Sequence, residues 1–90
     1  MYNIYTTNRF DKDLKRCKKR NYNLDLLKTV IDLLQENGKL PSKYKPHQLI
    51  GNYAGCWECH IKPDWILVWK QNDKELTLLL TNTGTHSDLF

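Results

Sequence analysis

The sequence predicts an α+β fold in which an N-terminal strand and a helical hairpin pack on a small, mostly antiparallel sheet. Two amphipathic helical patterns occupy the N-terminal half, and three strand-like runs separated by short turns occupy the C-terminal half. A chain of 90 residues can bury only one modest core, so helices on one sheet are its natural architecture. We therefore expect residues 1–90 to form a single domain.

The first predicted elements are a strand and a short helix. Residues 2–7 are rich in Tyr, Ile and Thr, which favour strands. Asn8 is expected to cap a helix that continues through Arg20. The apolar residues of this helix recur at helical spacing and form a narrow stripe toward a core: Phe10, Leu14 and Cys17.

A second helix is predicted between Asn23, which can cap it, and Gly38, which can end it. Asp25 suits its first turn because a carboxylate there faces the positive end of the helix dipole. Its apolar face consists of Leu24, Leu27, Val30, Ile31 and Leu34. Only a few residues separate the two helices, so they should form an antiparallel hairpin.

The C-terminal half predicts a three-stranded meander. Residues 40–51 contain two prolines and no sustained period, which indicates an irregular surface connection. The predicted strands are residues 53–61, 65–70 and 75–81, and the predicted turns between them are residues 62–64 and 71–73. Residues 65–69 are continuously apolar, as expected of the central strand.

Charge and hydropathy restrict the functional classes. Fourteen Lys and Arg against ten Asp and Glu give a net charge of +4, which suits a polyanionic or acidic partner but also suits a helix face that is merely solvated. No apolar stretch approaches the roughly 20 residues that span a bilayer, and the N-terminus has no hydrophobic signal core. We expect a cytoplasmic protein without a membrane partner.

The most conspicuous short motif is Cys-Trp-Glu-Cys-His at residues 56–60, which has the spacing of covalent haem attachment. A strand places Cys56 and Cys59 on opposite faces, so they cannot share one haem or one zinc ion without a bulge. We expect no metal, haem or other cofactor. The two cysteines are interpreted as small strand residues, one facing inward and one outward.

Three histidines are the candidates for acid–base chemistry: His47, His60 and His86. An imidazole titrates near neutral pH, so a metal-free acid–base enzyme would use such side chains. A single histidine in a small domain is more often a structural or merely exposed residue than a catalytic one. Asp64 lies one turn away from His60 and is the carboxylate considered as its partner.

Three segments resemble the YafQ branch of the RelE/ParE toxin superfamily. They are KPHQLIG at residues 45–51, HIKPDWILVW at residues 60–69 and TGTHSDLF at residues 83–90. The resemblance covers essentially the whole chain in order and length. It implies a RelE-like fold and a toxin of a toxin–antitoxin pair. Such a toxin is a metal-independent endoribonuclease that cuts mRNA, typically on the translating ribosome, and a cognate antitoxin neutralises it.

The resemblance also implies site residues. The family's functional histidines fall on His47, His60 and His86, its active-site acid on Asp64, and its C-terminal aromatic on Phe90. Trp65 matches a tryptophan beside the site, and a core anchor is an equally good interpretation of it. Phe90 is expected either to stack on a nucleobase or to close the core.

This set suits RNA cleavage by attack of the 2′-hydroxyl on the adjacent phosphorus, which needs a base, an acid and positive charge. His86 is interpreted as the general acid or its base counterpart, and His60 with Asp64 takes the opposite role. His47 would help to hold the phosphate.

One position departs from the family pattern. This chain has Asn82 where the branch usually has an arginine before Thr-Gly-Thr-His, and an amide cannot clamp a phosphate with a charged fork. Losing such a donor costs on the order of 10²-fold in rate. Either Lys62, Lys43 or Lys45 replaces it, or the protein is a weak or inactive member that only binds RNA or antitoxin.

A gyrase-poisoning toxin of the same superfamily is a further alternative. Toxins of that class lack the histidine-rich site, so the three histidines argue against it. We expect the antitoxin to cover the helical hairpin and the groove of the site.

Overall fold

A five-stranded mixed sheet forms the centre of the computed structural model, which describes residues 1–90. The strands are β1 (Asn3–Thr6), β2 (His47–Gln48), β3 (Cys56–Lys62), β4 (Trp65–Asn72) and β5 (Thr77–Gly84). Their order across the sheet is β1-β5-β4-β3-β2. Only β1 pairs in parallel, with β5, and the other three pairings are antiparallel. The predicted α+β class and mostly antiparallel sheet are confirmed.

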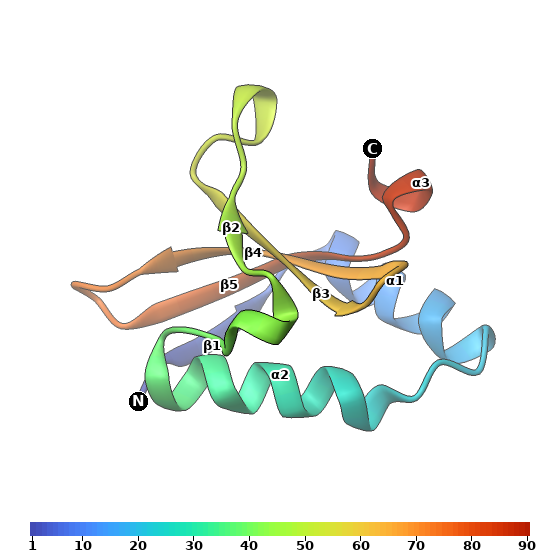
Figure 1. Ribbon diagram of the computed structural model, residues 1–90, viewed down its shortest axis with the longest axis horizontal. Coiled ribbons are helices and arrows are strands. Elements are labelled where there is room, and N and C mark those ends of the chain that lie inside the picture. Colours follow the sequence, from blue (N-terminus) through green and yellow to red (C-terminus); the bar gives the residue numbers. More distant parts are fainter.

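Two helices, α1 (Asn8–Lys19) and α2 (Leu24–Asn37), follow β1, and the chain reverses between them as predicted (Figure 1). Asn23 caps α2 by accepting a hydrogen bond from the Asp25 backbone, and Gly38 ends α2 in the left-handed conformation, both as predicted. The predicted cap of α1 was wrong by one residue. Thr7 is the cap, because its hydroxyl accepts from the Phe10 backbone and Asn8 is already helical.

The main core lies between the sheet and the two helices. Figure 1 shows α2 running along one side of the sheet. The buried residues of this core are Phe10, Cys17, Leu27, Val30, Leu34, Cys59, Ile61, Trp65, Leu67, Trp69, Leu78 and Leu80. Leu14 of the predicted helix stripe packs at its edge. The continuously apolar strand β4 is central in the sheet, as predicted, and buries residues on both faces.

The C-terminal half departs from prediction at four places. The strand predicted from residue 53 begins only at Cys56, after a short 3₁₀ turn, η2 (Gly51–Tyr53). The last turn lies at residues 73–76 instead of 71–73, because β4 continues to Asn72. The connection expected to be irregular contains η1 (Ser42–Tyr44) and also β2, which adds to the edge of β3. A final short helix, α3 (His86–Leu89), was not predicted.

The second face of the sheet carries no long helix. Figure 1 shows the β2–η2 segment and α3 on the side of the sheet away from α2. A smaller apolar cluster lies here, with Cys56, Ile66 and Val68 buried and Leu49 and Leu89 packed against them. No helix of the chain is long and apolar enough to cross a bilayer.

The cysteines have the opposed orientations that the sequence predicted. Cys59 is buried in the core beneath the helices, and Cys56 is buried in the cluster on the other face. Burial raises the pKa of the Cys59 thiol to about 12. These two thiols therefore do not meet at one ligand.

Candidate active site

The predicted histidines gather on the open face of the sheet because of the strand register. His47 of β2 lies opposite Glu58 of β3, Glu58 opposite Val68 of β4, and Val68 opposite Asn82 of β5. Directly opposed residues share a face, so these four positions form one row across the sheet. His60 follows Glu58 by two residues and therefore projects from the same face.

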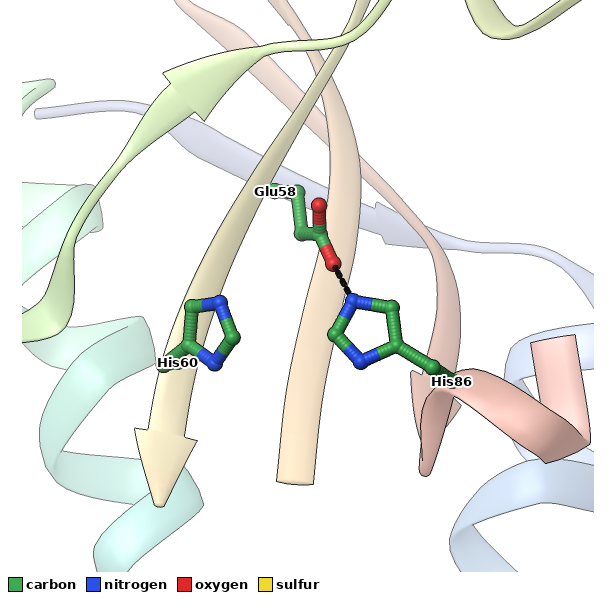
Figure 2. A group of neighbouring side chains, drawn as sticks. All are labelled: Glu58, His60 and His86. Carbon is green, nitrogen blue, oxygen red and sulfur yellow. Dashed lines mark ion pairs between the residues drawn. The ribbon is translucent and has the colours of Figure 1, made fainter. Parts of the chain in front are cut away.

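Glu58 is the centre of the cluster. Its side chain is 5% exposed, and its two carboxylate oxygens contact different histidines. Oε2 lies 2.9 Å from His47 Nε2, and Oε1 lies 2.7 Å from His86 Nε2. Figure 2 shows His86 approaching from α3 while Glu58 and His60 come from the same strand. Strands and the C-terminal helix therefore converge on one buried carboxylate.

The contact with His86 is close but not well directed, and Oε1 of Glu58 is left without a properly oriented hydrogen-bond donor. A buried carboxylate oxygen in that state costs free energy. A well-oriented donor group of a ligand would satisfy it. This corner of the site is therefore prepared to interact with a donor.

Backbone carbonyls orient two of the imidazoles. The Lys45 carbonyl lies 3.0 Å from His47 Nδ1, and the Pro63 carbonyl lies 3.3 Å from His60 Nδ1. A carbonyl only accepts, so each Nδ1 carries the proton and donates it. Nε2 of each ring is then the atom that faces other groups. For His47, that atom faces the Glu58 carboxylate.

His86 is held in place by the local structure of α3. Thr85 and Asp88 form a capping box: the Thr85 hydroxyl accepts from Asp88 N, and Asp88 Oδ2 accepts from Thr85 N. Gly84 precedes this box with φ +150°, and a Cβ there would lie 2.9 Å from the Asp88 carboxylate. The glycine of the Thr-Gly-Thr-His motif thus permits the close approach that starts the helix.

Helix α1 anchors this C-terminal helix. Arg20 donates to both oxygens of Asp88, at 2.7 and 3.1 Å. This guanidinium, with the hydrogen bonds from Thr85 and the charge of Arg16, holds the pKa of Asp88 well below its ordinary value. Asp13, which is fully buried, accepts from Arg16 and from the backbone of Thr83, the first residue of the motif.

Three predicted substrate-binding residues have distinct places. The ring centroid of Phe90 lies 6.0 Å from that of His86. It lies 4.7 Å from that of Tyr53, and the Phe90 and Tyr53 rings meet edge to face. Asn82 lies on the site face in the row of Glu58. Trp65 is 3% exposed in the main core and donates from its indole to Thr83 Oγ1, so the core-anchor interpretation describes its position.

Asp64 does not join the histidines. It lies exposed in the turn between β3 and β4 and lines a separate hollow with Asn21, Tyr22, Asn23, Lys62 and Trp65. Its neighbour Pro63 supplies the carbonyl that orients His60. Lys43, Lys45 and Lys62 line a cavity on the other side of that turn, together with His60.

Glu58 is the principal residue that sequence reasoning missed. Glu58 lies two residues before His60 in a strand, and side chains two residues apart point to the same face of a sheet. This two-residue spacing could have placed Glu58 beside His60 from the sequence alone. Tyr53 was missed because residue 53 was predicted to begin a strand. Asp13 and Asp88 were missed because tertiary partners decide their roles.

The same geometry can accommodate a cation. One ligand atom from each of Glu58, His60 and His86 lies within 4.8 Å of the other two. A carboxylate and two imidazoles are ligands that zinc and copper accept. The sequence led us to expect no metal ion at all, and this set of ligand atoms was not foreseen.

Comparison with known families adds to this geometry. The family model for YafQ, a bacterial toxin of type II toxin–antitoxin systems, matches residues 2–90. The chain belongs to the YafQ toxin family. The predicted resemblance is thereby confirmed. The toxin is 40% identical over 88 residues to the mRNA interferase toxin YafQ of Escherichia coli strain K12. The aligned region covers 97% of this chain and 94% of that protein.

Solved structures agree with the fold. YafQ in the E. coli DinJ–YafQ complex superposes with a TM-score of 0.90 at 37% identity, covering 100% of this chain and 99% of that one. A metal-bound toxin from Helicobacter pylori gives a TM-score of 0.91 at 43% identity, with 100% of both chains covered. The predicted RelE-like fold class is confirmed, and the toxin has relatives that bind a partner protein and a metal.

Proposed function

We propose that this toxin is an endoribonuclease that cuts mRNA on the translating ribosome by histidine acid–base catalysis. The observation that carries the proposal is the convergence of His47 and His86 on the buried carboxylate of Glu58, with His60 beside them. The name of its E. coli relative, an mRNA interferase, supports the substrate class. Family membership supports its role as a toxin.

In this proposal His60 and His86 form the acid–base pair. Nitrogen atoms of the two rings lie within 4.8 Å of one another, so both can hydrogen-bond to oxygens of one phosphate. One ring removes the 2′-hydroxyl proton as that oxygen bonds to phosphorus, and the other gives a proton to the departing 5′-oxygen. The products are a 2′,3′-cyclic phosphate and a free 5′-hydroxyl, and no metal is needed.

Glu58 and His47 support this pair electrostatically. Glu58 positions both His86 and His47 through the contacts of its two carboxylate oxygens. Because Asp64 lies outside the cluster, we give Glu58 the carboxylate role in this arrangement. Asp64 remains a candidate for contact with RNA beside His60, and Phe90 with Tyr53 offers an aromatic surface for a nucleobase.

The proposal is tested with His86→Ala and Glu58→Gln, each compared with Ser87→Ala, an exposed neighbour on α3. We expect single-turnover cleavage of a translated message to fall about 10²-fold or more for the first two variants, and Ser87→Ala to cleave at the wild-type rate. Circular dichroism must show the same fold for all three. A folded His86→Ala protein that cuts normally would refute the assignment.

A second candidate function is binding without efficient cleavage, which Asn82 favours because the family's arginine is missing there. The same assay separates the two. A wild-type toxin that arrests translation and binds ribosomes without cutting the message would replace the enzymatic proposal with the binding one.

We also propose that an acidic antitoxin covers the helical hairpin and the groove of the site. The E. coli relative has been solved in complex with DinJ, which supports a protein partner of this kind. Exposed and unpaired lysines on α1 supply complementary charge: Lys12, Lys15, Lys18 and Lys19.

A further inference from the structure

A cavity of about 500 Å³ lies beside the proposed active site, between η1, α2 and the end of β3. Its lining consists of Leu26, Thr29, Lys43, Tyr44, Lys45, His60, Ile61, Lys62 and Pro63. We call it the lysine pocket. Sites for small ligands typically enclose about 300–1,000 Å³, so its volume suits a single nucleotide.

The charge of the lysine pocket is entirely positive. Its rim contains Lys43, Lys45 and Lys62, and no aspartate or glutamate lines it. None of the three lysines forms an ion pair, whereas Arg9, Arg16 and Arg20 are all paired with carboxylates. No carboxylate therefore neutralises these three charges, and they are available to neutralise phosphate.

The interior of the lysine pocket is suited to a base. Leu26, Ile61 and Pro63 provide apolar lining, and Tyr44 provides an aromatic ring that is half-buried. Lys43 Nζ lies over that ring, 5.1 Å from its centroid, so a base that stacks on Tyr44 would displace the Lys43 ammonium from the ring and leave it free for the phosphate. A nucleobase stacks on aromatic side chains in single-stranded RNA recognition.

His60 connects the lysine pocket to the catalytic cluster. It lines the pocket, and its ring centroid lies 5.7 Å from that of His86. A group in the pocket is therefore within one nucleotide of a phosphate that lies between the two imidazoles. The Pro63 carbonyl that orients His60 belongs to the same wall, so occupancy and catalytic geometry are linked through one turn.

From these observations we propose that the lysine pocket binds the mRNA nucleotide adjoining the scissile phosphate, with its phosphate against the lysines and its base against Tyr44. This inference rests on the proposed ribonuclease function and adds a substrate subsite to it. The pocket supplies positive charge that Asn82 does not. It acts on binding and register, whereas the histidines and Glu58 act on the chemical step.

The test compares Lys43→Gln/Lys62→Gln with a matched control, Lys39→Gln/Lys74→Gln, which removes two exposed, unpaired lysines away from the pocket. Lys45 is left intact so that its left-handed backbone, with φ 51°, is not disturbed, because the main-chain carbonyl there orients His47. Cleavage of a translated message is measured at several toxin concentrations in single turnover. We expect the half-saturating concentration to rise about tenfold for the pocket variant, with its maximal rate within about threefold of wild type, and no change for the control.

A second measurement is independent of cleavage. Fluorescence anisotropy with a short 2′-O-methyl RNA strand, which cannot be cut, is recorded for the wild type, both lysine variants and Tyr44→Leu. We expect the pocket variant and Tyr44→Leu each to bind at least about fivefold more weakly than wild type, and the pocket variant to have a smaller dependence on salt. Equal loss in the two lysine variants, or wild-type binding by Tyr44→Leu, would overturn the proposal.

The two proposals fail in different ways. If the wild type binds the strand through the lysine pocket but never cuts a message, the ribonuclease function fails and the subsite stands as an RNA-binding site. If the wild type cuts normally and the pocket variant keeps its half-saturating concentration, the subsite fails and the ribonuclease function stands.

Discussion

At the scale of single residues, Glu58 gives the histidines a common geometry. Exposed histidines on a sheet would ordinarily be mobile, but Glu58 is buried and offers one oxygen to each of two rings. His47 and His86 are each about half exposed, at 49% and 51%, so RNA can reach them while Glu58 remains shielded from water. A polar contact with a shielded carboxylate is stronger than the same contact in solvent.

Asn82 leads to the first prediction at this scale. It lies two strands from Glu58 in the same row, separated only by Val68. Asn82→Arg would place a guanidinium on the face where the phosphate is proposed to lie. We expect the single-turnover cleavage rate to rise about tenfold or more, because the added donors stabilise charge that develops in the transition state.

The control for this change is Asn82→Gln, which lengthens the side chain without adding charge. It should cleave at the wild-type rate. An Asn82→Arg toxin that is no faster than either protein would show that a positive charge at position 82 does not accelerate the chemical step.

At the scale of elements, the decisive feature is how α1 holds α3. A helix of four residues is not stable by itself, because nucleation costs more than so few hydrogen bonds return. The capping box and the paired guanidinium of Arg20 compensate for that cost. The position of His86 therefore depends on a contact between residues 68 positions apart in the sequence.

Asp88→Asn is expected to destabilise the toxin by about 1–2 kcal/mol at pH 7, since it weakens a cap and a charge-assisted hydrogen bond. The folded-state pKa of Asp88 is lowered, so its contribution is complete above the ordinary carboxyl value of about 4 and is lost as the pH falls below it. Urea unfolding of both proteins at pH 7, 5 and 3 should show a gap that is constant at the first two values and smaller at the third.

Asp32→Asn is the matched control. Asp32 pairs with Lys28 at 2.7 Å, but both side chains are more than half exposed. Its loss should change the free energy of unfolding by less than about 0.5 kcal/mol. If Asp88→Asn is equally harmless, the anchoring of α3 by α1 contributes nothing to stability.

The elements also show what sequence could predict. The cap and end of α2, the buried β4 and the opposed cysteines follow from local pattern, and all three predictions are confirmed. Strand β2 and α3 were missed because each is too short to have a period, and each is stabilised by distant partners. Of the site, the histidines were found by residue type and resemblance, whereas Glu58 needed the register to show its partners.

At the scale of the whole molecule, the two faces of the sheet have separate roles. The helices bury one face and produce the stability of the fold, while the other is covered only by short segments that carry functional groups. Figure 1 shows this division, with α3 and the β2–η2 segment on the side away from α2. A sheet supported from one side keeps the row of site residues rigid without closing it to a large substrate.

The last prediction concerns the whole charge distribution. The toxin has a net charge of +4, and the unpaired lysines of α1 are exposed. If an acidic antitoxin covers the helical hairpin, electrostatic attraction should accelerate its association. We expect the association rate constant to fall about tenfold or more between 50 mM and 500 mM salt, with a much smaller change in the dissociation rate constant, as measured by stopped-flow fluorescence.

Lys12→Gln/Lys15→Gln should reduce both the association rate constant at low salt and its dependence on salt, whereas Lys39→Gln/Lys74→Gln should change neither. An association rate independent of salt would mean that apolar contacts guide the antitoxin, and its landing place would then be sought at the exposed Ile50, Tyr53 and Phe90 beside the site.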